Sequence, residues 1–244
     1  ELLQEYGAFD HPEAVLLDPR SATDEELAWL HTPEYVAAVK ALGSGSPGRI
    51  DGARFGFSGQ GDNPVYPKMF EAAALSTGGS LLAAEMVASG EVAAAFNISG
   101  GLHHAAAGHA SGFCVFNDPA LAVQYFLSQG KRVAYVDIDA HHGDGVEAAL
   151  LHDSRVYMIS VHDVERWQYT GNVRSGESSR ICNVPAPGDC TDSEFCYLME
   201  QIVLPFAVAA KPQAIVITCG ADALAGDPLS TMALSNITLW QAVE

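Results

Sequence analysis

The sequence predicts an α/β fold: one domain with a mainly parallel central β-sheet that is flanked by helices on both faces. Three observations lead to this prediction. Apolar segments of strand length alternate with segments of helical period, which is typical of parallel sheets covered on both sides. Polar clusters follow directly after three of the expected strands. The chain has 244 residues, 48% of them hydrophobic, which is enough for one large core over residues 1–244.

The first part of the chain favours helices. Thr23 and Glu26 form a plausible capping box ahead of an apolar run, and Thr32 before Pro33 marks a second helix start. Residues 43–66 are rich in Gly, Ser, Pro, Asp and Asn, which predicts a long loop. A helical period returns over residues 67–89.

From there on, strands and helices alternate. We expect strands at residues 92–98, 132–138, 155–161 and 214–219. We expect helices at residues 119–129, 145–152 and 193–209, the last interrupted by Pro205. The sequence has no internal repeat, and no second domain boundary is indicated.

Composition narrows the class of function. The formal charge is −18, from 12 basic and 30 acidic residues, which disfavours nucleic acids and anionic membranes and attracts basic protein tails or polyamines. No apolar run is long enough to predict a transmembrane helix, and the first residues are not a secretory signal. Five cysteines without a CxxC pair predict a reducing, cytoplasmic location. The first residue is not Met and residues 236–244 read as an interrupted helix, so we expect a chain that is incomplete at both ends.

The run 133–145 is the most informative segment. An apolar strand leads into carboxylates and imidazoles, and strand alternation would place Asp137, Asp139 and His141 on one side. Asp222 follows the expected strand 214–219, and parallel strands place their functional residues at one edge of the sheet. Asp139, His141 and Asp222 therefore form a candidate metal site with positions left open, as in catalytic rather than structural centres.

A tandem histidine pair follows the expected strand 92–98. His103 and His104 come directly after two glycines, and histidines beside a metal-activated water can serve as general base and then general acid. Such histidines need orienting carboxylates, and Asp137 and Asp144 are of the right type. Aromatic residues suited to line a pocket for an aliphatic chain occur at Phe113, after Gly112, and at Tyr169.

These motifs resemble the histone deacetylase superfamily, which has the arginase-like fold. The matching segments occur in family order and lie at residues 100–105, 110–118, 136–145 and 220–229. Leu102 stands where animal members usually have an aromatic residue, so the chain looks most similar to bacterial and archaeal acetoin-utilisation-type deacetylases.

The resemblance implies a zinc-dependent hydrolase that removes acetyl groups from lysine side chains, with one zinc ion per chain. The family's zinc ligands match Asp139, His141 and Asp222. Its tandem base and acid match His103 and His104, with Asp137 and Asp144 as their partners. Its substrate-binding residues match Asp62, Gly112, Phe113 and Tyr169. Its potassium site matches oxygens of Asp137, Asp139, His141, Ser160 and Val161.

The chain also departs from the family pattern. The substrate loop usually reads Phe-Pro-Gly-Thr-Gly, but residues 169–173 read Tyr-Thr-Gly-Asn-Val, which leaves the substrate preference open. The family's transition-state tyrosine lies beyond residue 244, so we expect this exact chain to be weakly active or inactive. An oxyanion donor of this kind contributes about 3–4 kcal/mol to transition-state stabilisation.

Three alternatives stay open at this point. The same chemistry could act on acetylated polyamines or other small acetylated amines instead of protein lysines. A ureohydrolase with two manganese ions is less consistent with the sequence, because Gly143 and the segment 220–222 lack the further carboxylates it needs. An inactive acyl-lysine binder is the third, and the intact ligands and histidines argue against it.

Overall fold

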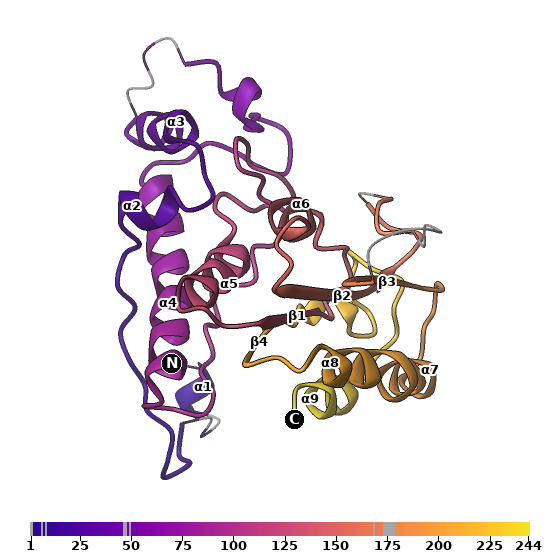
Figure 1. The fold of residues 1–244 in the computed structure, drawn as a ribbon. Coiled ribbons are helices and arrows are strands. Elements are labelled where there is room, and N and C mark those ends of the chain that lie inside the picture. The colour runs from indigo at the N-terminus through magenta and orange to yellow at the C-terminus, as the bar shows by residue number, and fades with distance from the viewer. Residues whose placement is uncertain are drawn as a thin grey trace.

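Four parallel strands in the order β3-β2-β1-β4 form the sheet of the described residues (Figure 1). The computed structural model describes residues 2–5, 7, 9–45, 48, 50–167, 169–172 and 179–244. The strands are β1 (Val133–Asp137), β2 (Val156–Asp163), β3 (Ile181–Ala186) and β4 (Ala214–Thr218). The predicted α/β class is therefore confirmed, and β3 is a strand that the sequence did not predict.

Helices cover both faces of this sheet (Figure 1). The helical segments are α1 (Leu2–Glu5), α2 (Asp24–Leu27), α3 (Pro33–Gly43), a 3-10 helix (Gly52–Phe55), α4 (Met69–Ser89), α5 (Asp118–Ser128), α6 (Asp144–Leu150), α7 (Asp192–Leu198), a π-helix (Met199–Val203), α8 (Leu204–Ala210), a 3-10 helix (Ala221–Ala223) and α9 (Asn236–Val243). The predicted capping box at Thr23 and the cap at Thr32 are both present.

The alternation of β1 divides the core. Val133 and Tyr135 pack with α5 and α6, whereas Val136 and Ile138 pack with α7 and α9 on the other face. Every residue of β1 is buried. A strand that is covered on both sides has to be apolar throughout, which explains the continuous apolar run that leads to Asp137.

The predicted strand at residues 92–98 is wrong. The segment is irregular and forms no strand, and Phe96 and Ile98 are exposed. The side-chain amide of Asn97 instead donates 2.9 Å hydrogen bonds to the Ser76 carbonyl and the Ser80 hydroxyl. These two bonds hold the segment against α4. A strand needs a partner for its backbone groups, and among the described residues β4 is paired only with β1.

One helical run, Asp192–Ala210, has the length and mean hydropathy (1.2) of a membrane span. It comprises α7, the π-helix and α8, and it therefore continues through the predicted interruption at Pro205. Phe195, Met199 and Val203 pack into the core beneath the sheet. These core contacts explain part of the apolar composition of the run Asp192–Ala210.

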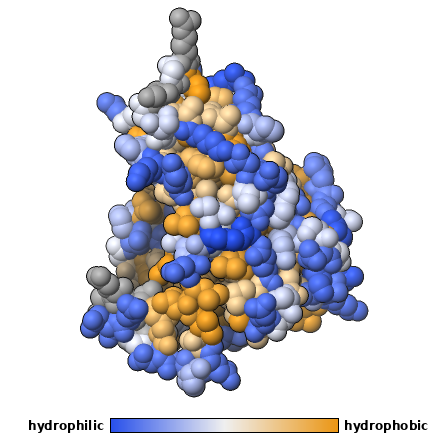
Figure 2. All heavy atoms as spheres, turned by 90° about the vertical axis from the view of Figure 1, so that its left-hand side faces the viewer, coloured by the Kyte–Doolittle hydropathy of each residue, from blue (hydrophilic) through white to orange (hydrophobic). Residues whose placement is uncertain are grey.

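Figure 2 shows the side of the molecule that carries α2, α4 and the N-terminal segment. Apolar surface appears there in patches separated by hydrophilic side chains. Val15, Leu16 and Leu17, which precede α2, are exposed. All five cysteines are free thiols, as the absence of paired cysteine motifs predicts.

Candidate active site and metal centre

The carboxyl ends of β1 and β4 bring the predicted metal ligands together. The Ile138 amide donates a 2.8 Å hydrogen bond to the Thr218 carbonyl, so the pairing of these strands continues just past β1. The 3-10 helix at Ala221–Ala223 then turns Asp222 back, and its Oδ1 accepts a 3.1 Å hydrogen bond from the Ala140 amide. Two segments separated by about eighty residues thus share one site.

The sequence led us to expect that strand alternation puts Asp139 and His141 on the same side as Asp137. This expectation is wrong, because the strand does not continue that far. β1 ends at Asp137, and the following residues form a turn in which carboxylates accept backbone hydrogen bonds. The Asp139 amide donates to Asp137 Oδ1 over 3.2 Å, and the His141 amide donates to Asp139 Oδ1 over 2.7 Å. Asp137 is fully buried below this turn, while Asp139 and His141 lie nearer the surface.

Asp139, His141 and Asp222 form a compact cluster. One ligand atom from each lies within 4.8 Å of the others, and each residue is partly accessible. His141 Nδ1 is 2.7 Å from Asp222 Oδ2 and 3.3 Å from Asp139 Oδ1. The three residues that the sequence selected as ligands are the only such group of His, Cys, Asp and Glu found within the described part of the chain.

The chemistry of this cluster fits a divalent cation. Hydrogen bonds to Asp139 and Asp222 raise the pKa of His141 to about 10, because the two carboxylates stabilise a positive charge beside them. Nitrogen and carboxylate oxygen are zinc ligands, and bonds of about 2 Å in a tetrahedron separate ligand atoms by about 3.3 Å. A Cβ at Gly220 would overlap Asp139 Oδ2 and lie 2.6 Å from Asp222 Oδ1, so only glycine leaves room for both carboxylates.

The tandem histidines form two parallel histidine–aspartate pairs. His103 Nδ1 lies 2.8 Å from Asp137 Oδ2, and His104 Nδ1 lies 2.8 Å from Asp144 Oδ1. The two Nε2 atoms are turned toward each other at 3.0 Å, and His103 Nε2 is 3.6 Å from Asp139 Oδ1. Each imidazole is thereby fixed at Nδ1 and presents Nε2 to the side of the metal cluster.

Local charge distributes protons unequally over this pair. Burial opposes protonation of His103, but the carboxylates of Asp137 and Asp139 outweigh it and raise the pKa of His103 to about 9. Burial lowers the pKa of His104, and its hydrogen bond with Asp144 only partly offsets this effect. The chain's own groups therefore favour a protonated His103 that donates to a neutral His104.

Comparison with known proteins identifies the family. Residues 1–244 match the histone deacetylase domain. The acetoin utilization protein AcuC of Bacillus subtilis (strain 168) is 37% identical over 250 residues, which cover 100% of this chain and 64% of that protein. The chain belongs to the histone deacetylase family. A probable histone deacetylase 1-B of Xenopus laevis is 33% identical over 239 residues, or 96% of this chain and 49% of that protein.

Solved structures of histone deacetylase homologues share the fold of this domain. The crystal structure of the homologue from Aquifex aeolicus superposes with a TM-score of 0.89 at 31% identity, over 99% of this chain and 67% of that one. A homologue complexed with SAHA gives the same TM-score at 32% identity. The deacetylase domain described here spans less than two thirds of the length of its curated relative AcuC.

Two adjacent residues support the tandem histidines of the deacetylase domain, and sequence reasoning assigned them no role. The Asp118 carboxylate accepts hydrogen bonds from the amides of Gly101 and Leu102, at 3.1 and 2.8 Å, and from the Ser80 hydroxyl. The side-chain amide of Asn117 donates to the carbonyls of His103 and Ala105, at 3.1 and 2.9 Å. The start of α5 thus holds the backbone on both sides of the pair. Asn117 and Asp118 are the last two residues of the segment 110–118, which matches the family. That match could have indicated a role for them.

Tyr135 is a third residue to which the sequence assigned no role. Its hydroxyl donates to Asp137 Oδ2 over 2.6 Å and lies 2.9 Å from Thr218 Oγ1. Asp137 therefore receives hydrogen bonds from both Tyr135 and His103 while fully buried. Tyr135 precedes Asp137 by two residues on the same face of β1, so strand alternation was enough to predict this contact.

The residues predicted to bind substrate lie outside the helices and strands. Phe113 and Tyr169 are 62% and 71% exposed, and both have positive φ angles of 67° and 49°. Asp62 is exposed in the long loop that the sequence predicted. The Trp167 indole, which the sequence did not single out, has its ring centroid 5.2 Å from that of His104.

Three of the predicted potassium ligands, Asp137, Ser160 and Val161, lie on the neighbouring strands β1 and β2, and Asp139 and His141 lie in the turn after β1. Asp137 pairs with Ser160 in the register of β1 and β2, and Val161 follows directly. The Ser160 hydroxyl lies 2.9 Å from His162 Nδ1. Ion binding by these residues stays a prediction.

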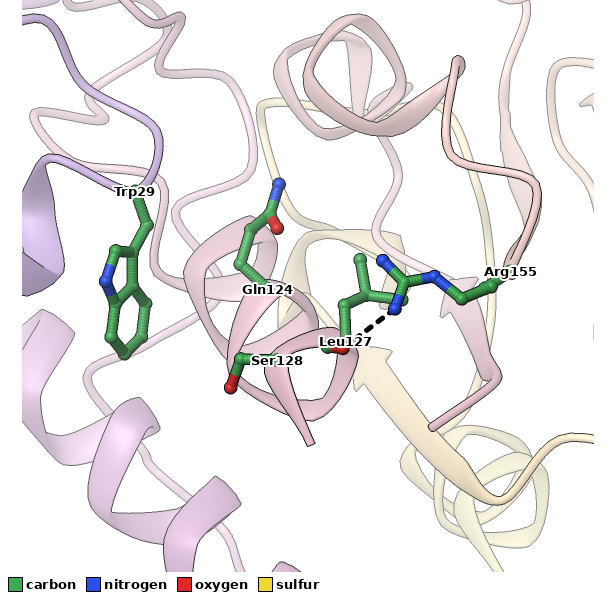
Figure 3. A pocket seen from close by; sticks show the side chains of 5 residues that line it. All are labelled: Trp29, Gln124, Leu127, Ser128 and Arg155. Carbon is green, nitrogen blue, oxygen red and sulfur yellow. Dashed lines mark hydrogen bonds between the residues drawn. The ribbon is translucent and has the colours of Figure 1, made fainter. Parts of the chain in front are cut away.

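A cavity of about 310 Å³ lies elsewhere (Figure 3) and is lined by Trp29, Gln124, Leu127, Ser128 and Arg155. Leu127 and Ser128 end α5, and Arg155 directly precedes β2. The cavity is therefore at the amino ends of the strands, at the opposite edge of the sheet from the metal ligands. We assign the chemistry to the cluster of titratable groups rather than to this cavity.

Proposed function

We propose that the protein is a zinc-dependent amide hydrolase that removes acetyl groups from lysine side chains of proteins. The observation that carries this proposal is the pairing of the metal-ligand cluster with two oriented histidine–aspartate pairs, whose Nε2 atoms meet beside Asp139. Membership of the histone deacetylase family supports the same activity.

Asp139, His141 and Asp222 would hold the zinc ion. Bound there, zinc supplies a Lewis acid that polarises the amide carbonyl and lowers the pKa of water. Burial lowers the pKa of His104, which favours its neutral form, and its Nε2 can take a proton from the attacking water once the hydrogen bond from His103 to that atom is exchanged for one from the water. The histidine pair can then deliver a proton to the departing nitrogen, so that the amide C–N bond breaks and acetate and a free lysine amine form.

Orientation of the histidines is the task of the buried aspartates. Asp137 and Asp144 hold the Nδ1 atoms, so the two Nε2 atoms, which lie 3.0 Å apart, are the positions for proton transfer. We assign substrate contacts to Asp62, Gly112, Phe113 and Tyr169, because the two exposed aromatic rings can cover the apolar stem of a lysine. We also retain potassium as a structural ion at the neighbouring oxygens of Asp137, Asp139, His141, Ser160 and Val161.

The net charge of −18 favours cationic substrates. It suits acetylated lysine within a basic protein segment, and it suits an acetylated polyamine equally well. Acetylpolyamine hydrolysis is therefore our second candidate function. We favour action in the cytoplasm and not on nucleic acids or membranes. A single cluster of metal ligands in the described residues is an argument for one metal ion rather than the two of a ureohydrolase.

The test uses the natural full-length protein loaded with zinc. Metal content and hydrolysis of an acetyl-lysine peptide and of acetylspermidine are measured for wild type, Asp139→Asn, His104→Ala and the control His152→Ala, which changes an exposed histidine. We expect Asp139→Asn to lose zinc and His104→Ala to keep zinc but lose turnover, by about 10² or more.

The outcomes separate the candidates. Faster hydrolysis of acetylspermidine than of the peptide favours the second function. Binding of acetyl-lysine without any turnover by the wild type would identify an inactive binder, and two manganese ions per chain would restore the ureohydrolase. Full activity of His104→Ala would show that the assignment of base and acid is wrong.

A further inference from the structure

The indole of Trp167 packs directly on the tandem histidines. Its ring centroid is 5.2 Å from that of His104, and the two planes meet at 83°, which is the edge-to-face geometry of aromatic pairs. His104 is buried, whereas Trp167 is 42% exposed. Trp167 therefore lies on the solvent side of the imidazole that the proposed mechanism uses.

Gly112 makes this approach possible. A Cβ built on Gly112 would lie 2.5 Å from His104 Cδ2 and 2.7 Å from Trp167 Cζ3, so any side chain there would displace one ring. Gly112 also has a φ of 50°, which glycine adopts without strain. Trp167, His104 and the backbone of Gly112 thus meet in one close contact beside the metal ligands.

The loop that carries Trp167 is anchored on both sides. Before it, the Asp163 carboxylate accepts hydrogen bonds from the Thr231 amide and hydroxyl, at 2.7 and 2.6 Å. After it, the Thr170 hydroxyl lies 2.9 Å from His142 Nδ1, and the Gly171 carbonyl lies 3.2 Å from His162 Nε2. Thr170 stands where the family pattern usually has proline, which has no hydroxyl, so this anchor is a feature of the present chain.

We propose that Trp167 is a specificity-determining residue that limits the size of the acyl group. This inference rests on the proposed function. Phe113 and Tyr169 are the more exposed rings and suit the lysine stem, while Trp167 reaches inward to His104. The carbon that is attacked must lie beside His104, so the acyl chain attached to it begins next to the indole. An acetyl group ends at this point, whereas each added methylene would have to displace the ring.

The experiment compares kcat/KM for peptides that carry acetyl-, butyryl- and octanoyl-lysine. It uses the zinc-loaded full-length wild type, Trp167→Ala, Trp167→Phe and Trp29→Ala. Trp29 is a matched control because it is also 42% exposed and lines the distant cavity of Figure 3. We expect Trp167→Ala to raise the butyryl-to-acetyl ratio by about tenfold or more, Trp167→Phe to lie between, and Trp29→Ala to leave the ratio unchanged.

Two further measurements make the outcome decisive. Zinc content and thermal unfolding show whether a variant is folded and loaded, and Thr170→Val and Thr170→Ser replace Trp167→Ala if that variant does not fold. Thr170→Val should raise the butyryl-to-acetyl ratio. Thr170→Ser keeps the hydroxyl and should leave the ratio at the wild-type value. An unchanged ratio in folded, active variants overturns the role of Trp167. A wild type that hydrolyses no acyl-lysine instead overturns the proposed function.

Discussion

A fall in pH should lower the free energy of unfolding of this protein through His31. This buried histidine is remote in sequence from the candidate site but is hydrogen-bonded to Asn117 beside it. The side chain of His31 is 1% exposed. Its Nδ1 lies 3.1 Å from the Ala106 carbonyl, and the backbone N–H of Asn117 donates to its Nε2 over 3.0 Å. The ring must therefore be neutral, with the proton on Nδ1. Protonation at Nε2 would remove the acceptor of the residue that holds the backbone of His103 and Ala105.

The size of the effect follows from the change in pKa. Burial lowers the pKa of His31 from 6.5 to about 4. Between these values the unfolded chain binds more protons than the folded one, so the free energy of unfolding falls as the pH falls. From pH 7 to pH 5 the loss attributable to His31 is about 2 kcal/mol, and it approaches about 3 kcal/mol near pH 4.

Chemical denaturation at pH 7 and pH 5 measures this loss in the presence of a chelator. His31→Gln keeps a donor and an acceptor but cannot become charged, so its unfolding free energy should fall by about 2 kcal/mol less than that of the wild type over this interval. The exposed His152→Gln is the control and should behave as the wild type does. Equal pH dependence of wild type and His31→Gln would refute the reasoning.

Three further substitutions test how the site is held. Gly220→Ala should abolish zinc binding, measured by metal analysis, because its Cβ overlaps Asp139 Oδ2; retention of stoichiometric zinc would contradict the close approach. Asp118→Asn should lower stability by about 1–3 kcal/mol in denaturation and reduce kcat more than zinc content, since one of its acceptor oxygens is lost; unchanged kcat would remove its positioning role. Tyr135→Phe should cost about 1–2 kcal/mol and shift the pH profile of kcat, because Asp137 loses a donor; an unshifted profile would separate Tyr135 from His103.

Local sequence was sufficient for the elements whose environment is uniform. β1 is apolar because both faces are covered, and its polar continuation indicated Asp139 and His141 as candidate ligands, which lie together with Asp222 in the structure. The caps at Thr23 and Thr32 are contacts within a few residues, and they form as predicted. The segment 92–98 has the same apolar character, but no strand pairs with it, and composition alone cannot show whether a partner is present.

β3 illustrates the opposite error. Its sequence contains Asn183 and Pro185, which lower its strand propensity, yet it pairs with β2 at the edge of the sheet. An edge strand needs hydrogen bonds on one side only, so proline is tolerated there. Pairing with a distant segment decided this element, and such pairing is not encoded in a local pattern.

The sequence by itself predicted the fold class, the three candidate metal ligands and the tandem histidines, because alternating apolar segments and the polar motifs that follow them can be recognised locally. Only the tertiary structure decided which groups hold them. The contacts of Asn117 with His31, of Gly112 with Trp167 and of Thr170 with His142 join segments that no spacing rule connects. They depend on the close packing of side chains from separate elements, and this packing exists only after the chain has folded.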